Sequence, residues 1–559
     1  MCSTPHLAIP IVALSIGILA PIFTPGPAAV VSAASPFLVS RPAPPAPPRT
    51  LLDTTLTPQK RPPLVVRAGG DFQAALEAAQ PGDVISLEAG AVFRGNFILP
   101  QKAVGDWIVV RSSASDASLP SPGTRITPAF ASSMPKLVTP NSVQVVQTAP
   151  GASRYRFIGI EFTVSPNVKT IRQIIAFGGL QSTIAATPSQ LVLDRCYVHG
   201  QPTTNVFRGV LLNSASSAVI DSHVSDIHVA GYDSQAILAY NGPGPFKIVN
   251  NYLEAAGENL MFGGGDPRIP DLVPSDIEIR HNHLVKPLKW RQGTAEFVGI
   301  QWTIKNLLEL KNAQRVLVEG NVLENVWAGA QGGAAVVLTP RSGGRAPWSV
   351  VQDVMFRNNI VKNAVGGLGV QSTDNGHPSG ALRRIAIVNN LWLSIDRVFI
   401  TIAVPSTPLE DFVVDHNTAI PTRYFSHDLD AAISPALVRF QFTNNLTGFG
   451  TYGVKFPRTA ATLARWSPAA IIAKNALVAL GQVSGERQAG ANQPWGLGAH
   501  MYMVLPSAEA AGLSPGGTLS ANGILKGAGT DGRDIGVDFE ELERVTGIGH
   551  KSLHTRGDH

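Results

Sequence analysis

The chain repeats one short pattern of alternating apolar and polar positions. Each copy has a strand-like alternation, a polar pair that usually ends in asparagine, and a further apolar stretch, as in Phe246-Lys-Ile-Val-Asn-Asn251-Tyr-Leu. Alternation with period two predicts a β-strand, and self-similarity at a spacing of about 20–50 residues predicts a solenoid. Equivalent positions fall 27 to 39 residues apart, at residues 196, 223, 251, 282, 321, 359, 390, 417 and 445.

A constant strand pattern with a variable repeat length predicts an all-β fold, namely a single-stranded parallel β-helix over residues 64–450. A short strand cannot bury its apolar face alone, so successive coils must stack to complete the core. Asparagine suits the turn because it tolerates left-handed backbone. We expect the repeated asparagines to be structural, with each side-chain amide bonded to the next coil.

The start of the repeat region supports a family resemblance. An amphipathic helix is predicted over residues 71–80, followed by Pro81-Gly-Asp-Val-Ile85 leading into the first coil. With the repeats, this resembles the right-handed parallel β-helix proteins of the pectate-lyase-like superfamily. The resemblance implies an N-terminal capping helix and a small C-terminal cap. We place the cap and tail at residues 451–559, with helical character at 460–465, 469–480 and 539–545.

The N-terminal region has the composition of an export signal. An apolar run at residues 7–23 and the small residues after it predict a signal peptide over 1–34. Residues 35–63 are Pro-rich and are predicted to be a disordered linker. We therefore expect a secreted, periplasmic or cell-surface protein with no stable membrane insertion after processing. Cys2 would leave with the signal peptide, and Cys196 is expected in the core.

Composition narrows the partners. Charged residues make up 15% of the chain, the formal net charge is +5 and the pI is about 9.2. The basic residues are scattered and lack the dense Lys/Arg runs of nucleic-acid-binding proteins. This composition is compatible with an anionic polysaccharide, and the resemblance implies a polysaccharide substrate. We expect a monomer with no nucleic-acid partner.

The densest run of unusual polar residues lies between Asp233 and Lys311. Aligning the second strand of each coil places several of these residues in columns, and coils one strand spacing apart allow neighbours to cooperate. The candidate catalytic residues are Asp233, Glu258, His283, Lys305, Lys311 and Arg341. The candidate substrate-binding residues are Gln235, Asn241, Asn259, Trp290, Trp302 and Trp348. Asp266 is the candidate metal ligand, with Ca²⁺ as the cation considered.

The resemblance implies two chemistries for such a column. Uronate lyases of this superfamily place a carboxylate, often with calcium, beside a Lys or Arg that takes a proton, whereas its glycosidases use paired carboxylates. The Asn-x-Asp phrase of polygalacturonases and the Arg-x-Pro-x-x-Arg phrase of pectate lyases are both absent. We favour a lyase on an acidic glycan, with a glycoside hydrolase or a non-catalytic glycan-binding protein as alternatives.

Each candidate also has a structural interpretation. The basic residues could form an internal salt-bridge ladder with the carboxylates, and the tryptophans could pack loops rather than sugar rings. Insertions near 267–276, 286–302 and 341–350 are expected on one side, where they would wall a groove.

Overall fold

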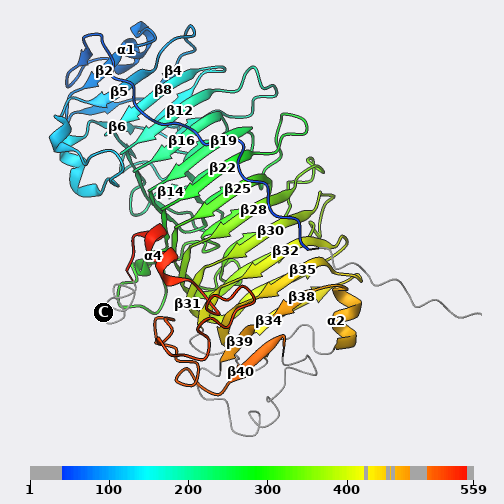
Figure 1. The fold of residues 1–559 in the computed structure, drawn as a ribbon. Helices are drawn as coiled ribbons and strands as arrows, with labels where there is room; N and C mark the ends of the chain where they lie inside the picture. The colour runs from blue at the N-terminus through cyan, green and yellow to red at the C-terminus, as the bar shows by residue number, and fades with distance from the viewer. Residues whose placement is uncertain (1–40, 421–425, 449–452, 455–459, 479–499, 550–559) are drawn as a thin grey trace, which may run out of the picture. The chain divides into compact units, whose positions relative to one another are not determined.

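The computed structural model describes residues 41–420, 426–448, 453–454, 460–478 and 500–549, all within one compact unit that spans Val39–His559. The predicted signal peptide lies outside these residues. The unit is a right-handed parallel β-helix, which confirms the fold expected from the repeats (Figure 1). Every named strand pair in it is parallel, as stacking of successive coils requires.

One face of the solenoid is a 14-stranded sheet, here called sheet A. Its strands follow the chain in order: β1 (Leu64–Val66), β2 (Val84–Leu87), β5 (Ile108–Ser112), β8 (Ser153–Ile158), β12 (Ser189–Asp194), β16 (Ala215–Ile220), β19 (Gly244–Val249), β22 (Ser275–Arg280), β25 (Ala313–Glu319), β28 (Val351–Arg357), β30 (Leu382–Val388), β32 (Leu409–Asp415), β35 (Leu437–Thr443) and β38 (Ile471–Ala473).

The second sheet has 24 strands, and its pairings divide it into two ladders. Ladder 1 follows sheet A in each coil and comprises β3 (Val92–Arg94), β6 (Lys136–Thr139), β9 (Glu161–Val164), β13 (Tyr197–His199), β17 (His223–Ile227), β20 (Tyr252–Ala255), β23 (His283–Val285), β26 (Val322–Val326), β29 (Ile360–Gln371), β31 (Leu391–Val404), β33 (Thr418–Ile420), β36 (Leu446–Gly448), β39 (Asn475–Val478) and β40 (Tyr502–Leu505).

Ladder 2 comes next along each coil and carries the candidate site. It comprises β4 (Phe97–Leu99), β7 (Val146–Thr148), β11 (Ile175–Phe177), β15 (Arg208–Leu212), β18 (Gln235–Ala239), β21 (Glu258–Phe262), β24 (Leu308–Leu310), β27 (Ala334–Leu338), β34 (Ser426–Ala431) and β37 (Gly453–Val454). The long strands β29 and β31 run through both ladders and join them. A separate two-stranded sheet is formed by β10 (Thr170–Ile171) and β14 (Asn205–Val206), which precede the ladder 2 strands β11 and β15 in the sequence.

The corner between sheet A and ladder 1 is held by a ladder of asparagine amides. Asn251 donates to Asn282, Asn282 to Asn321, and the chain of bonds continues coil by coil to Asn475, with each distance between 2.9 and 3.0 Å. All are buried, so each bond satisfies a polar group that water cannot reach. The left-handed residue is the one before each ladder asparagine, for example Asn250 with φ 57°. In the earlier coil Ser222, rather than His223, occupies the ladder position.

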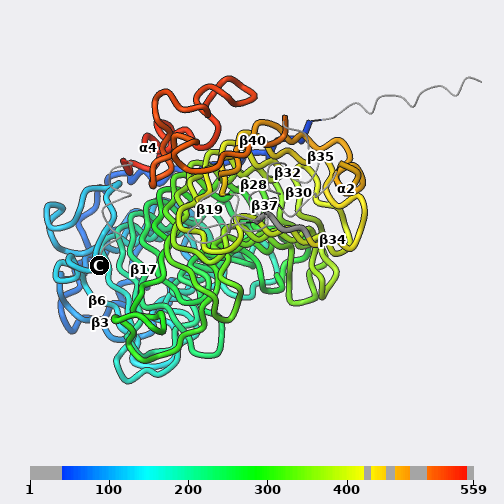
Figure 2. Tube along the Cα trace, turned by 90° about the horizontal axis from the view of Figure 1, so that it is seen from below, coloured from blue at the N-terminus to red at the C-terminus, as the bar shows by residue number. Residues whose placement is uncertain are grey.

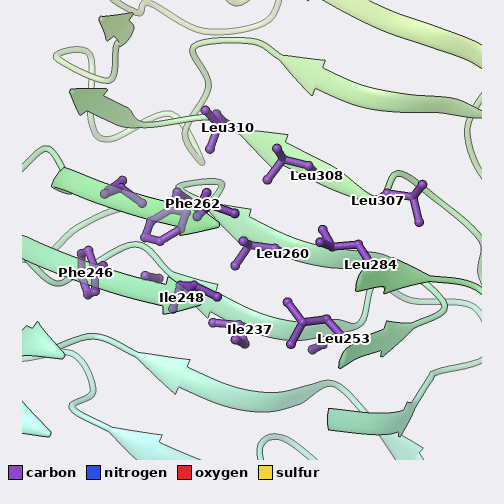
Figure 3. Packing of buried hydrophobic residues seen from close by; sticks show 14 of the residues in the cluster. Ile237, Phe246, Ile248, Leu253, Leu260, Phe262, Leu284, Leu307, Leu308 and Leu310 are labelled. Atoms are coloured by element: carbon purple, nitrogen blue, oxygen red, sulfur yellow. The ribbon is translucent and has the colours of Figure 1, made fainter. Parts of the chain in front are cut away.

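Apolar side chains from all three faces fill the inside of each coil (Figure 3). Phe246 and Ile248 come from sheet A, Leu253 from ladder 1, and Leu260 and Phe262 from ladder 2, and none is more than 1% exposed. Burying such a side chain contributes roughly 1.5–3 kcal/mol. Cys196 is also fully buried, as expected.

A helix closes the N-terminal end of the core. Helix α1 (Phe72–Ala78) begins at Asp71, whose side chain accepts a hydrogen bond from the backbone N–H of Ala74. This is an ordinary N-cap and stabilises the first turn. Phe72 packs edge-on against Phe97 of β4 with ring centroids 4.8 Å apart, so the helix covers the open end of the stack.

The coils continue past residue 450, where we expected the repeat to end. Helix α2 (Ala460–Trp466) matches the expected helical segment, but residues 471–478 form strands β38 and β39 rather than a helix. Asn475 takes the ladder position of this extra coil. The alanines around it favour a helix locally, but stacking on the previous coil outweighs that propensity.

The last described segment packs on the outside of ladder 1, as seen along the stack in Figure 2. It contains helix α4 (Phe539–Thr546), which matches the helical segment expected at 539–545 and begins after the N-cap Asp538. Val537 and Leu542 form a small buried cluster with Ile360 and Leu391. Short 3₁₀ turns complete the described elements: η1 (Asp116–Ser118), η2 (Pro128–Ser133) and η3 (Leu288–Trp290). Among the described residues, no helix is both long and apolar enough to cross a membrane.

Candidate functional site

The outer face of ladder 2 carries an unusual set of charged side chains. Near the start of ladder 2 strands, two successive side chains point into the interior of the coil. At β24 these are Leu307, just before the strand, and Leu308, its first residue, and both lie in the core. The residues on either side of such a pair therefore point outward. In β21 these outward positions hold Glu258 and Met261, and the β24 residue paired with Met261 is Glu309.

Lys305 links two of the predicted residues directly. Its Nζ lies 2.8 Å from Asp233 Oδ2 and 2.8 Å from Glu258 Oε1. The other Glu258 oxygen accepts a 2.7 Å hydrogen bond from Gln235, which is the register partner of Glu258 on β18. Glu258 is fully buried, whereas Asp233 is 49% exposed, so the lysine joins an internal carboxylate to a surface one.

Glu309 extends this cluster by one coil. Lys311 lies 3.3 Å from Glu309, and the charge of the nearby Glu258 acts on the Glu309 carboxyl. Burial raises the pKa of Glu309 to about 7, with Lys311 opposing the shift and the charge of Glu258 adding to it. Burial also opposes ionisation of Glu258, but the charges of Lys305 and Lys311 outweigh it and hold the Glu258 pKa below its usual value. Two nearby carboxyls cannot both ionise easily, and the opposite shifts of their pKa values mean that Glu309 holds a proton more readily than Glu258 does.

A buried lysine supports the cluster from inside. Lys286 is fully buried, and its Nζ donates to the carbonyls of Ala255, Gly257 and Asn306 and to Asn259 Oδ1, at 2.5 to 3.1 Å. Gly257 and Asn306 immediately precede Glu258 and follow Lys305 in the sequence. Lys286 therefore fixes the backbone that positions both charged side chains. Burial lowers its pKa to about 7.

A cleft of about 540 Å³ opens beside this cluster. Its floor is formed by outward residues of β18 and β21 and the glycines after β21. Tyr232, which is 69% exposed, stands at its rim. The lining side chains include Arg172, Phe207, Arg208, Tyr232, Asp233, Gln235, Tyr240, Asp266, Arg268 and Arg345. Through Asp233 and Gln235 the cleft connects directly to Lys305 and Glu258.

The charge of the cleft is predominantly positive. Within the described part of the chain, no ion pair joins Arg172, Arg208 or Arg268 to a carboxylate. Arg172 stands over the Phe207 ring at 5.2 Å. Arg208 is half-buried, and its Nε has no hydrogen-bond partner among the described residues. Burial lowers its pKa, while nearby acidic groups oppose the shift. A buried guanidinium N–H without a partner is costly, so an anionic ligand would relieve this site.

Arg341 and Asp266, two predicted site residues that follow ladder 2 strands, have ion-pair partners outside the Lys305 cluster. The backbone N–H of Arg341 donates to the Lys311 carbonyl at 2.8 Å, but its guanidinium pairs with Asp374 at 3.1 Å and with Asn375 at 2.8 Å. Asp266 lines the cleft but is engaged by Arg345, through its backbone N–H at 3.1 Å and its guanidinium at 3.3 Å. Both belong to ion pairs at the ends of ladder 2 strands.

The donor set does not suit Ca²⁺. Calcium requires several oxygen ligands, but the carboxylates here already bind lysine or arginine cations. No group of three or more His, Cys, Asp or Glu side chains that could hold a metal occurs among the residues described. Lys305 and Lys311 supply the positive charges at this site.

His283 does not join the cluster. It lies on β23 in ladder 1, where its Nε2 is 2.9 Å from Glu324 and its ring meets Tyr252 edge-on. It lines a different groove, which also contains Lys362. The prediction of a single pocket containing His283 therefore fails, because His283 lies on the ladder that precedes ladder 2 in the coil.

Four predicted substrate-binding residues are internal instead. Trp290 and Trp302 are 3% and 5% exposed and pack with His228, with Trp302 stacked on the imidazole at 3.8 Å. Asn241 is fully buried, and its amide spans the Gly179 and Gln181 carbonyls. Asn259 is also buried and bonds the Leu253 and Val285 carbonyls. These side chains shape the loops and turns around ladder 2 but cannot reach a ligand in the cleft.

Trp348 and the insertions stand at the edges of ladder 2. Trp348 is half-buried, and its indole N–H donates to the Leu272 carbonyl at 3.1 Å, so it ties two insertions together. The insertions at 267–276 and 341–350 both follow ladder 2 strands, whereas 286–302 precedes the ladder 2 strand β24. They therefore flank the ladder 2 face at both of its edges rather than on one side.

Glu309 and the cleft arginines Arg172, Arg208, Arg268 and Arg345 were not among the predicted site residues. Arg208 and Glu309 each stand one position outside a pair of inward residues, a displacement that strict alternation along the strand does not reveal. Arg172, Arg268 and Arg345 lie on loops with no periodic signal. An outward acidic residue in an otherwise apolar strand, Leu308-Glu-Leu310, was the one available signal.

No family model matches the chain, and no curated protein matches it. Among solved structures, an alginate lyase from Paenibacillus sp. str. FPU-7 aligns with 12% identity and a TM-score of 0.33 over 63% of this chain and 98% of that chain. A PL6-family alginate lyase aligns with 11% identity and a TM-score of 0.43 over 87% and 57% of the two chains. A polygalacturonase from Erwinia carotovora ssp. carotovora aligns with 12% identity and a TM-score of 0.37 over 65% and 96%.

Proposed function

We propose that the protein acts on an acidic polysaccharide, which binds in the ladder 2 cleft and is cleaved by β-elimination. The observation that carries this proposal is a set of cleft arginines, Arg172, Arg208 and Arg268, that form no ion pair with any carboxylate among the described residues. A guanidinium matches the geometry of a carboxylate and binds it through two parallel hydrogen bonds. Phe207, Tyr232 and Tyr240 add ring faces and edges that suit sugar rings.

β-Elimination at a uronate requires three catalytic roles. A cation must neutralise the uronate carboxylate, a base must remove the proton from the adjacent C5, and a proton must reach the leaving oxygen on C4 as the C4–O bond breaks. The electron pair of the C5–H bond forms the C4=C5 double bond. We assign neutralisation of the uronate carboxylate to Arg208, because this residue is half-buried at the cleft and its Nε has no hydrogen-bond partner among the described residues.

The proton steps are assigned to the Glu309–Lys311 pair. Lys311 could act as a base only if a cationic neighbour such as Arg341, or burial under Trp302, disfavoured its charged form. The Arg341 guanidinium pairs with Asp374, which offsets its positive charge, and Trp302 packs in another cluster. The neighbour of Lys311 is Glu309, whose pKa of about 7 suits a general base near neutral pH. Glu309 is only 2% exposed and does not line the cleft, so this assignment requires the glycine turn at residues 263–265, which packs on Lys311, to move aside when the glycan binds. Glu309 then takes the C5 proton, and the protonated Lys311 gives a proton to the leaving C4 oxygen.

The test is a glycan panel assayed for two products at once. Alginate, polygalacturonate and a glucuronan are compared with a neutral glucan, with ultraviolet absorbance for unsaturated uronate and a separate assay for new reducing ends. We expect both signals on an acidic glycan only. Reducing ends without absorbance would indicate a hydrolase, and binding without either signal would indicate a glycan-binding protein.

Two variants separate the cleft from the fold. Arg208→Gln should raise KM for the acidic glycan about tenfold or more, as expected for loss of a charge-assisted pair, with a near wild-type melting temperature. Arg397→Gln changes an exposed arginine on β31 and is the matched control. Lys311→Ala should reduce kcat more than stability. A large stability loss with retained activity would instead make Lys311 part of a structural salt-bridge ladder.

Cellular location is part of the same proposal. An exported protein would meet such a polymer, and the predicted signal peptide at residues 1–34 would direct export. Residue-specific identification of the mature N-terminus from secreting cells tests this point.

A further inference from the structure

A proline-rich segment lies across the outer face of sheet A. Residues 35–63 were expected to form a disordered spacer, but residues 41–55 run over successive strands of this sheet, visible as the dark blue trace in Figure 1. The backbone N–H groups of Ala43, Ala46 and Arg49 donate to Asp411, Asp353 and Asp276 at 2.9, 3.0 and 2.8 Å. These are the only residues between 42 and 49 that possess an N–H, because the others are prolines.

Burial along this segment has a period of three. Pro42, Pro45 and Pro48 are half-buried against the sheet, and the residues between them are exposed. A period of three residues is that of the polyproline II helix, the conformation that proline favours. From Thr50 onward the period changes to two, with Leu52 and Thr54 half-buried. The carbonyls of these two residues accept hydrogen bonds from Lys247 and Arg156.

The receiving surface is a column of alternating acids and bases. The column runs through six consecutive strands of sheet A as Asp276, Arg315, Asp353, Arg384, Asp411 and Arg439, each with φ between 53° and 60°. Arg315, Arg384 and Arg439 each bind the Asp of the preceding coil through two hydrogen bonds, at 2.5 to 3.0 Å. Each Asp is therefore held rigidly and still accepts one N–H from the proline-rich segment.

The two periods agree closely in length. A polyproline II helix rises about 3.1 Å per residue, so three residues span about 9.3 Å. Strands in a sheet are about 4.8 Å apart, so two coils span about 9.6 Å. The acids occur on every second coil, and an N–H occurs at every third residue. The mismatch of a few tenths of an ångström per contact is small enough to be absorbed by the aspartate side chains.

We propose that this Asp column is a binding site for polyproline II segments that carry an N–H at every third residue. Its occupant is the chain's own segment, residues 41–49. Recognition depends on spacing and on charge-assisted hydrogen bonds to backbone, and requires no aromatic groove. The site lies on sheet A, away from the ladder 2 cleft, and is independent of the proposed function.

The experiment shifts the register in the full-length protein. One variant receives a single Pro between Pro48 and Arg49, and a second receives Ala-Pro-Pro at the same place. The single insertion breaks the period, whereas the triple insertion restores an N–H opposite each Asp. We expect the amides of Ala46 and Arg49 to exchange hydrogen about tenfold faster or more in the first variant, the order expected for loss of charge-assisted bonds, and at near wild-type rates in the second.

A point variant tests the contacts themselves. Ala46→Pro removes one N–H but keeps the polyproline II conformation, and should speed exchange at Ala43 and Arg49. Ala46→Gly retains the N–H, and Pro47→Ala changes an exposed proline; both are controls expected to change exchange far less. None of these positions lies in the core, so folding is not at risk. Equal exchange in the single and triple insertions, or no change in Ala46→Pro, would overturn the proposal.

Discussion

Lys305 Nζ lies 2.8 Å from Glu258 Oε1, and the same nitrogen lies 2.8 Å from the half-exposed Asp233, so Lys305 links the fully buried Glu258 to a carboxylate at the surface. Lys305→Met should leave the Glu258 carboxylate buried without its main counter-charge. Breaking a buried pair in this way costs roughly 3–5 kcal/mol. Urea unfolding of the variant measures the loss in free energy of unfolding.

The double variant Lys305→Met, Glu258→Gln is the matched control for this pair. Removing both charges should recover most of the lost stability, because the remaining amide needs no counter-charge. If Lys305→Met alone unfolds at the wild-type urea concentration, then solvent or Lys311 compensates Glu258 and the pair is not a stability determinant.

The Glu309 carboxyl predicts a pH effect on stability. Its folded-state pKa of about 7 lies above the usual value of 4.5, so the folded protein binds more protons than the unfolded chain between these pH values. Its contribution to stability therefore falls as pH rises from about 4.5 to 7. Glu309→Gln should remove this fall and should also abolish turnover, since the amide cannot accept the C5 proton. Urea unfolding at several pH values, with and without the substitution, provides the measurement.

Lys286 predicts the opposite slope in a different pH range. Its pKa of about 7 lies below the usual value of 10.5, so the unfolded chain binds more protons between these values. Stability should therefore rise with pH from about 7 to 10.5. In Lys286→Met this rise should vanish, and about 3 kcal/mol should be lost at pH 7 because the carbonyls of Ala255, Gly257 and Asn306 lose their donor. An unchanged slope in the variant would contradict the assignment.

The aspartates under the proline-rich segment predict release in acid. Burial opposes ionisation of Asp276, Asp353 and Asp411, but hydrogen bonds from Arg315, Arg384, Arg439 and the segment's own N–H groups lower each pKa. Such a contribution is fully present above the unfolded value near 4 and is lost as pH falls through the lower folded values. A fluorophore on Pro44→Cys, in a Cys2→Ser background, should therefore show reduced anisotropy only below about pH 4.

The control for acid release replaces all three aspartates by asparagine. An amide oxygen can still accept an N–H but does not titrate, so the anisotropy should no longer change with pH in this range. A wild-type acid transition in the triple variant would place the titrating groups elsewhere.

Much of the fold could be predicted because each coil of the solenoid repeats the same sequence pattern. Every copy of the strand phrase and its asparagine adds independent support, and the ladder from Asn251 to Asn445 follows directly. The copy around Asn475 was missed because its alanines also fit a helix, and only stacking on the preceding coil decides between the two. The docked segment at residues 41–49 was missed because proline periodicity carries no apolar signal, and its partners lie hundreds of residues away.

The part of the site that could be predicted consists of residues at equivalent positions of successive ladder 2 strands. Asp233, Glu258 and Lys305 were grouped by aligning equivalent strands, and the structure brings them into contact. His283 was misplaced because sequence spacing does not show which of two neighbouring ladders a short strand joins. The burial of Trp302 depends on how a long insertion folds back onto His228, and no local pattern encodes that path.

The contact between Ala43 and Asp411 has a consequence for the order of folding. These residues are 368 positions apart, and Ala43 belongs to the part of the chain that is synthesised first. Its partner exists only after the coil containing Asp411 has formed on those before it. If the coils form from the N-terminal end, the segment attaches progressively, first at Thr54 on Arg156 and later at Arg49 on Asp276. Only the part around Ala43 waits, extended and unattached, until the coil that contains Asp411 has formed. Proline suits such a wait, because a segment with few N–H groups cannot add itself as a stray strand to an unfinished sheet edge.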